Sequence, residues 1–408
     1  MFLLNFFAHY LPPQRYNFFF IYPNKTSKTV KLFLITLKIF VYMHFLLYLC
    51  TKLCNNCNRY MSSVAFWIKN ARSIALPQSA LPCLTAIILC IGQDGFIWWL
   101  SFPVFFGICA AHLGMNLADD YFDYKHDSRV RSDLSSTSIR ARMEKCHYIQ
   151  SGATDIRHLG WAVVAFLAFA GAMGAIAFIA QWLIHGWQAA VGILTYALLG
   201  LIFGINYSGK PFELGYHGLG ELVIGVMFGP LNMLGVQAAL TGNIFSWPML
   251  CISIGIGCMV TNIVYVHSVM EVNADAELNK MTFARLLMGK DINNHGKQRM
   301  VLFIGIFAVI PFVMLITGIL LGWWSPWYLL TLCTLPMSIF LIHSTRLFAY
   351  GLPRIDNPRW WMGPMGDWAA YVQSGMDWFL FRWLLARNIC TFFCLILIIV
   401  HIALLITT

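Results

Sequence analysis

The chain has 408 residues, of which 59% are hydrophobic and 11% charged, and its formal net charge is +10. Soluble domains carry about 25% charged residues, so this composition excludes an ordinary soluble protein. The positive charge does not indicate nucleic acid, because no segment is a compact basic domain and basic residues beside membrane segments usually set topology. We therefore expect a polytopic membrane protein whose partners include a lipid bilayer and no nucleic acid.

Residues 1–60 differ from the rest of the chain. They contain the apolar stretch "TVKLFLITLKIFVYMHFLLYLC" (29–50), which Lys31 and Lys38 interrupt. An extra helix, a signal-like segment and sequence upstream of the working start are all compatible with this pattern. We interpret residues 1–60 as an extension that is dispensable for function, and residues 61–408 as one membrane domain.

Apolar runs long enough to cross a bilayer recur after residue 60. They predict an all-α bundle of about nine transmembrane helices, with the N-terminal extension as a possible further hydrophobic segment. Pro82 leaves open whether the first helix is continuous. The predicted spans are 78–92, 97–118, 159–183, 188–206, 220–240, 247–268, 300–321, 327–348 and 388–406.

The loops between these spans alternate in charge. One set is very short, as in "GQDG", "LIHGW", "TGNIFS" and "LGWWSP", and contains no lysine or arginine. All twenty lysines and arginines that follow residue 60 fall in the other set. The positive-inside rule places that set in the cytoplasm. Its last member, residues 346–387, is rich in tryptophan and predicts a segment at the membrane interface.

The first motif with chemical meaning is "GMNLADDYFDYKHDS" (114–128), directly after an apolar run. In a helix, four of its side chains share one face: Asn116, Asp120, Asp123 and Asp127. Carboxylates at this spacing repel one another, and more strongly beside hydrocarbon. A solvated helix end is the simpler interpretation, but a bound cation explains four aspartates in nine residues better. Mg²⁺ prefers such oxygen ligands and completes its coordination with water and phosphate.

A second acidic motif, "YVHSVMEVNADAELNKMTFARLLMG" (265–289), ends a later inward-running span. His267, Glu271 and Asp275 follow one another at intervals of four residues. Alone this spacing is weak evidence, but it lies on the same side of the membrane as the first motif. Two such clusters across one cavity predict two Mg²⁺ ions on one diphosphate.

The segment "NYSGKPFELGYHGLGELVIGVMFGPLNMLG" (206–235) lies between the two motifs. It brings Tyr207 and Lys210 to the same side of the membrane. Glu221 stands at the head of the next span. It is either a charge that the helix dipole favours or a part of the site, and the sequence leaves both open.

Together these stretches resemble the UbiA superfamily of intramembrane prenyltransferases. "NLADDYFDYKHD" is similar to the first aspartate-rich motif of that family, and "HSVMEVNADAELNKMTFARLLMG" to its second. "YSGKPFELGYHGLGELVIGVMFGP" and "ARSIALPQSALP" resemble the branch that prenylates 1,4-dihydroxy-2-naphthoate in menaquinone synthesis. The resemblance covers about residues 65–345 and the final span.

The chain departs from the family pattern chiefly in the second motif. His267 stands where the family has asparagine, and Glu271 where it has the first aspartate. Asn279 replaces a glycine, the arginine after the threonine run is displaced to Arg285, and Asp119 replaces a usual asparagine of the first motif. Glutamate keeps a metal ligand but lengthens it by one methylene.

The resemblance implies Mg²⁺-dependent transfer of a polyprenyl group from its diphosphate to an aromatic acceptor, with 1,4-dihydroxy-2-naphthoate the expected acceptor. It implies a bacterial-type inner membrane and a site that faces the cytoplasm. The expected catalytic residues are Asp120, Asp123, Glu271 and Asp275, which together with Asp127 would hold the metal. The expected substrate-binding residues are Asn116, Tyr207, Lys210, His267, Lys280, Arg129 and Arg131, with Arg140 and Arg142 as further loop arginines.

Three other functions compete with this one. A UbiA-type enzyme with a different acceptor is the strongest, and an inactive relative follows from the altered second motif. A cation transporter would place its carboxylates near the bilayer midplane on broken helices. Here both clusters end helices on one side, which disfavours transport.

Overall fold

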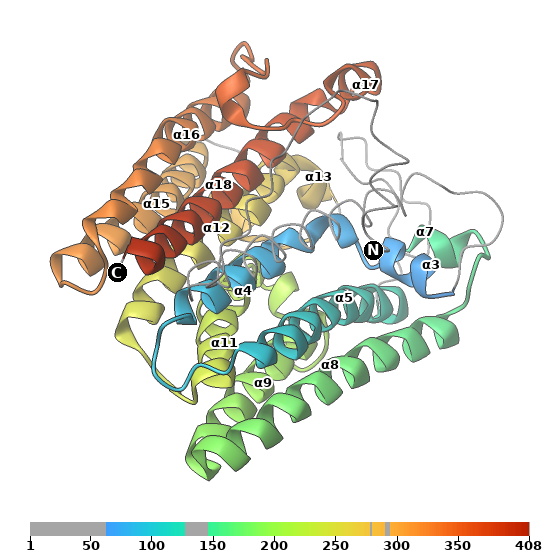
Figure 1. The fold of residues 1–408 in the computed structure, drawn as a ribbon. Coiled ribbons are helices and arrows are strands. Elements are labelled where there is room, and N and C mark those ends of the chain that lie inside the picture. The colour runs from blue at the N-terminus through green and yellow to red at the C-terminus, as the bar shows by residue number, and fades with distance from the viewer. Residues whose placement is uncertain (1–62, 127–145, 278–279, 290–293, 408) are drawn as a thin grey trace, which may run out of the picture. The chain divides into compact units, whose positions relative to one another are not determined.

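A computed structural model describes residues 63–126, 146–277, 280–289 and 294–407 (Figure 1). The chain divides into two units, Met1–Asn55 and Asn56–Thr408. The first unit lies outside the described residues, and with it the expectation for the N-terminal extension. The second unit is described below.

The described residues form helices and no strand, which confirms the predicted all-α class. Among them, nine helical stretches are long and apolar enough to cross a membrane. Their bounds are Ser73–Cys90, Trp98–Lys125, Ile156–His185, Trp187–Ser208, Gly220–Thr241, Trp247–Met270, Asn294–Leu320, Pro326–Ala349 and Asp377–Thr407. The number of spans is the predicted one, and their order along the chain is the same.

Helix α5 (Ser101–His126) and helix α8 (Ile156–His185) run side by side, with α9 (Trp187–Ser208) against α8 (Figure 1). Both α8 and α9 leave most of their apolar side chains exposed within the structure. Apolar surface of this kind is stable when lipid covers it. The first span, α4 (Pro77–Cys90), runs through Pro82 without a break.

The fifth span changes its helical pitch midway. It consists of α10 (Gly220–Val226), the π-helical segment η4 (Met227–Leu231) and α11 (Asn232–Thr241). Pro230 lies in η4, where the wider turn accommodates a residue that lacks an N–H group. A Cβ on Gly229 would lie 2.6 Å from the Cα atom of Gly257 in the sixth span, so this crossing requires glycine.

Helix α12 (Trp247–Met270) is the most buried of these spans. It contacts α10, α15 (Asn294–Leu320) and α18 (Asp377–Thr407). A span with protein on all sides is apolar throughout, whereas α8 is apolar because lipid faces it. The second acidic motif therefore leaves the membrane from the centre of the bundle.

The predicted start of the last span, residue 388, is wrong, because α18 begins at Asp377. The added turns contain Arg382, a residue typical of loops in membrane proteins. Its guanidinium is fully buried and donates to both carboxylate oxygens of Asp356, at 2.8 and 3.1 Å, and to the carbonyl oxygen of Ser344. A paired and hydrogen-bonded charge is compatible with the inside of a helix bundle.

Candidate functional site

The first acidic motif occupies the last turns of α5. Asp120 and Asp123 are buried there, and Asp119 is partly buried. We call these three residues the first half-site. Several predicted residues of the following loop lie outside the described residues: Asp127, Arg129, Arg131, Arg140 and Arg142.

Arg72 binds two carboxylates of the first half-site. Its Nη2 atom lies 2.5 Å from Asp120 Oδ1 and 2.7 Å from Asp119 Oδ2. The residue occupies a left-handed turn, with φ of 59°, between α3 (Ser63–Asn70) and α4. Burial alone would lower the pKa of Arg72, but the charges of Asp120 and Asp119 outweigh it and raise the pKa. The guanidinium is thus a fixed cation beside these acids.

Asn116 ties this turn to α5. Its side-chain amide donates to the backbone carbonyl oxygen of Ala71 at 2.9 Å. The backbone carbonyl oxygen of Asn116 accepts a hydrogen bond from the Arg72 guanidinium at 3.1 Å. The predicted substrate-binding amide therefore also fixes the position of the arginine.

Three hydroxyl groups also contact the first half-site. Tyr148, in the short helix α7 (His147–Gln150), donates to Asp120 Oδ2 at 3.0 Å. Burial raises the pKa of Tyr148, and the charge of Asp120 raises it further, so the phenol stays protonated as a donor. Tyr216 donates to Asp123, and Ser208 donates to Asp119.

The second half-site is Glu271 and Asp275, both buried. Helix α12 ends at Met270, and α13 (Val272–Glu277) begins directly after Glu271. His267 Nε2 lies 3.1 Å from Glu271 Oε2. The rings of His267 and of Phe379 in α18 are nearly perpendicular, with their centroids 4.9 Å apart. The two residues of the second motif that were expected to depart from the family pattern are therefore in contact with each other.

Asp275 is held by the loop that follows it. The hydroxyl of Thr282 donates to Asp275 Oδ2 at 3.3 Å and also caps α14 (Phe283–Met288). The backbone N–H of Lys280 donates to the carbonyl oxygen of Asp275 at 2.9 Å. The carboxylate and the backbone carbonyl of Asp275 thus both hold the turn that contains Lys280 and Thr282.

The loop between α9 and α10 contacts the first half-site and the segment that follows the second half-site. Tyr216 reaches Asp123 on one side, and the N–H of Gly218 donates to the carbonyl oxygen of Met281 at 3.0 Å on the other. Gly218 has φ of +76°, and a Cβ there would meet Leu286 at 3.3 Å. The two acidic motifs, far apart in sequence, are therefore joined to one short loop.

Glu221 strengthens this connection. It lies in the first turn of α10, and both carboxylate oxygens accept from the backbone N–H of Phe283 at 3.2 Å. It is therefore a favourable charge at a helix N-terminus and also a tie to the second motif. The sequence had left these two roles open, and the structure combines them.

The other predicted substrate-binding residues lie around this loop. The Tyr207 ring packs closely against Gly215 and Gly220. A Cβ atom on either glycine would lie only 3.2 to 3.3 Å from a ring carbon of Tyr207. Lys210 is exposed and Lys280 half-buried, and neither forms an ion pair within the described ranges. Both ammonium groups are thus available to an anion.

The donor set of the two half-sites fits Mg²⁺. No group of three or more His, Cys, Asp or Glu side chains gathers at one point among the residues that the structure describes. Two separate pairs of buried carboxylates are present instead, Asp120 with Asp123 and Glu271 with Asp275, and Asp119 lies beside the first pair. Mg²⁺ binds through one or two carboxylates and takes its remaining oxygens from water and substrate phosphates, so each pair suits one ion.

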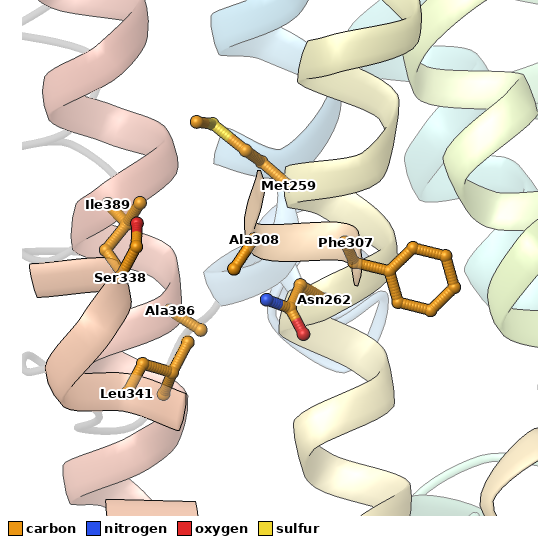
Figure 2. Close-up of a pocket in the computed structure, with 8 residues that line it drawn as sticks. All are labelled: Met259, Asn262, Phe307, Ala308, Ser338, Leu341, Ala386 and Ile389. Atoms are coloured by element: carbon orange, nitrogen blue, oxygen red, sulfur yellow. The ribbon is translucent and has the colours of Figure 1, made fainter. Parts of the chain in front are cut away.

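Two hollows in the structure lie away from the acidic residues. The first is a cavity of about 10 Å³ between α12, α15, α16 (Leu335–Ala349) and α18, lined by apolar side chains with Asn262 and Ser338 (Figure 2). It has room for about one water molecule. The second is an outer hollow of about 640 Å³ on α15, lined by His295, Gln298, Arg299 and Leu302. Neither has a lining residue from the half-sites.

Sequence reasoning missed Arg72, Tyr148, Tyr216 and Ser208 as contacts of the first half-site. In the sequence, Arg72 served only as one of the basic residues that indicate membrane topology. Its position at the start of a span, within a stretch that resembles the family, could have indicated a role in the site. Tyr148 and Tyr216 carry no such signal, because their approach to α5 depends on the packing of distant segments.

Similarity to known proteins agrees with this arrangement. The chain is 26% identical over 283 residues to a 1,4-dihydroxy-2-naphthoate octaprenyltransferase of Mycobacterium tuberculosis, which covers 68% of this chain and 85% of that protein. It is 29% identical over 166 residues to a 2-carboxy-1,4-naphthoquinone phytyltransferase of Synechocystis sp., covering 41% and 47%.

The fold is also similar to a solved digeranylgeranylglyceryl phosphate synthase structure, with a TM-score of 0.51 at 13% identity, over 84% of this chain and all of that one. The model of the UbiA prenyltransferase family matches residues 79–354, a range that contains the described residues of both half-sites. The chain belongs to the UbiA prenyltransferase family and is an integral membrane prenyltransferase.

Proposed function

We propose that this prenyltransferase transfers the prenyl group of a polyprenyl diphosphate to 1,4-dihydroxy-2-naphthoate, with Mg²⁺ as its cofactor. The observation that carries the proposal is the pair of buried half-sites joined by one loop, Asp120 and Asp123 on one side and Glu271 and Asp275 on the other. Two relatives with naphthoate-derived substrates in their names support this acceptor.

In this proposal each half-site holds one magnesium ion, with Asp127 as a further ligand in the first. Bound magnesium neutralises the diphosphate as the allylic C–O bond breaks. The protein contributes carboxylates that are already oriented. Arg72 and Tyr148 hold Asp120, and Tyr216 holds Asp123, so little reorganisation is needed when substrate arrives.

Cationic side chains assist the departure of diphosphate. Lys210 and Lys280 stand on the two loops that meet between the half-sites, with Arg129 and Arg131 on the loop after α5. The apolar spans keep water from the allylic cation until a ring carbon of the acceptor attacks it. The ring then regains its aromaticity by losing a proton or, in 1,4-dihydroxy-2-naphthoate, by losing its carboxylate as CO₂. The twenty basic residues after residue 60 support a cytoplasmic site in a bacterial-type plasma membrane.

A second candidate is transfer to a different aromatic acceptor. The specific observation in its favour is the altered second motif, in which His267 contacts Glu271 where the family has asparagine and aspartate. A longer carboxylate arm shifts the bound diphosphate, and with it the carbon that the acceptor must reach.

Labelled farnesyl and longer prenyl diphosphates test both candidates. Membranes that contain the full chain are incubated with each diphosphate and a panel of hydroxylated aromatic acids, with Mg²⁺ or with a chelator. We expect a prenylated naphthoquinol product that requires Mg²⁺. Product with another acid alone favours the second candidate, and no product with any acid contradicts both.

A further inference from the structure

A buried polar group lies in the bilayer part of the bundle, behind the first half-site. His112, Asn116 and Asp120 follow one another at intervals of four residues on one face of α5. Eight residues at 1.5 Å each place His112 about 12 Å along the helix from Asp120. An ionisable side chain at this depth is costly and usually has a function.

Three spans converge on this histidine. Its Nδ1 atom lies 2.6 Å from the hydroxyl of Ser79 in α4. Its ring lies over Phe228 of η4, with the ring centroids 4.6 Å apart and the planes inclined by 38°. Asn232 contacts the same two residues, because its amide donates to the carbonyl oxygens of Ser79 at 2.9 Å and Phe228 at 3.4 Å. His112 and Asn232 are therefore neighbours.

Two polar atoms of this group are left over. Asn232 is 9% exposed, and its Oδ1 atom is buried without a hydrogen bond to any described residue. The hydrogen bond of His112 uses Nδ1, which leaves Nε2 without a partner among the described residues. Polar residues that only join helices satisfy their atoms across the interface. Two unused atoms on neighbouring side chains indicate a missing polar partner instead.

The backbone around this group is also irregular. The π-helical turn η4 places Phe228 beside His112, and Asn232 begins the next helix. Single π-turns within helices occur frequently at functional sites. A flat aromatic side chain and two polar atoms suit an aromatic ligand that carries hydroxyl groups.

We propose that His112 and Asn232 bind the hydroxyl groups of the aromatic acceptor, with His112 Nε2 as the principal contact. This assignment rests on the proposed function. A hydroxyl both donates and accepts, so one hydroxyl of the acceptor pairs with Nε2 in either tautomer, and the other donates a hydrogen bond to Asn232 Oδ1. The distance of two helical turns to Asp120 leaves the prenyl carbon between the diphosphate and the acceptor ring.

Two amide substitutions distinguish binding from a structural role. In His112→Gln the amide falls near the position of Nε2, whereas in His112→Asn it falls near Nδ1, the atom that contacts Ser79. An acceptor-binding role requires the glutamine variant to keep affinity and the asparagine variant to lose it. A purely structural tie to Ser79 requires the reverse order. Asn232→Leu removes the second contact at similar volume.

The measurement is equilibrium binding of labelled 1,4-dihydroxy-2-naphthoate to the purified full chain, with farnesyl diphosphate plus Mg²⁺ as the second probe. We expect acceptor Kd to rise about tenfold in His112→Asn and Asn232→Leu, and to stay within about twofold in His112→Gln. Farnesyl diphosphate Kd should not change in the three variants, which also reports that they are folded.

Equal acceptor binding by all variants, or loss in His112→Gln with retention in His112→Asn, overturns the assignment. The dimethyl ether of the acceptor provides a further check, since wild type should bind it about tenfold more weakly and Asn232→Leu should discriminate less. If wild type transfers the prenyl group and the variants bind the acceptor as wild type does, the proposed function stands and the acceptor site is refuted. If the variants differ in acceptor binding as expected but wild type shows no transfer, the acceptor site stands and the proposed function is refuted.

Discussion

The two half-sites hold their carboxylates by different chemistry. In the first, the guanidinium of Arg72 pairs with Asp119 and Asp120. In the second, Glu271 contacts the imidazole of His267, and Asp275 accepts a hydrogen bond from the hydroxyl of Thr282. A fixed guanidinium offsets part of the carboxylate charge before any ligand arrives, whereas a hydroxyl group offsets less. We therefore expect an incoming metal to contribute more order to the second half-site than to the first.

The largest effects should come from the carboxylates themselves, and they test whether both half-sites are needed. Asp120→Asn and Asp275→Asn should each lower the transfer rate about 10³-fold, because each removes a carboxylate that would hold Mg²⁺ beside the diphosphate. The matched control is Asp155→Asn, the same change at the exposed N-cap of α8, which should leave the rate unchanged. Near-normal turnover in either site variant would remove that half-site from the mechanism.

Arg72 tests the chemistry that distinguishes the first half-site. Arg72→Met leaves Asp120 buried without its cation, and we expect a loss of about 2 kcal/mol, less than for a fully buried pair because Arg72 is 29% exposed. Arg72→Lys keeps the charge but loses the planar fork, so it should recover only part of the stability. Thermal unfolding in detergent measures both, with exposed Arg157→Met as control. Unfolding temperatures equal to wild type would contradict the pairing.

His267 tests the expected metal dependence of the second half-site. His267→Phe removes the contact with Glu271, and we expect the Mg²⁺ concentration for half-maximal transfer to rise about tenfold. His267→Asn restores the family residue and should cost less. Tyr216→Phe is the corresponding change at Asp123 and should shift the Mg²⁺ requirement less, because Arg72 remains. A larger shift for Tyr216→Phe would reverse the comparison.

The smallest effect should come from the turn after Asp275. Thr282→Val removes the hydroxyl that caps α14 and contacts Asp275, which should lower the free energy of unfolding by about 1 kcal/mol. Thr282→Ser keeps the hydroxyl and serves as its control. Denaturant unfolding compares the two variants, and a Thr282→Val variant as stable as wild type would contradict a stabilising role of the hydroxyl.

The membrane architecture followed from local sequence. Runs of apolar residues and the segregation of basic residues predicted nine spans in the correct order, since each span satisfies its own backbone within one segment. The start of α18 failed this reasoning because Arg382 is compensated by Asp356, a residue of a separate loop. A charged residue suggests a loop when only the sequence is considered, because the partner that neutralises it is distant along the chain.

Helical spacing within each motif also predicted which carboxylates share a face, and the position of both motifs on one side of the membrane predicted that they pair. Tertiary structure alone decided what holds them. Arg72 reaches Asp120 across 48 positions, and Tyr216 reaches Asp123 across 93. Periodicity contains no information about such contacts, because they depend on how whole helices pack. The chain by itself determined a membrane bundle with two acidic motifs, and the packing of α4, α5 and the loop before α10 determined how those acids are held and joined.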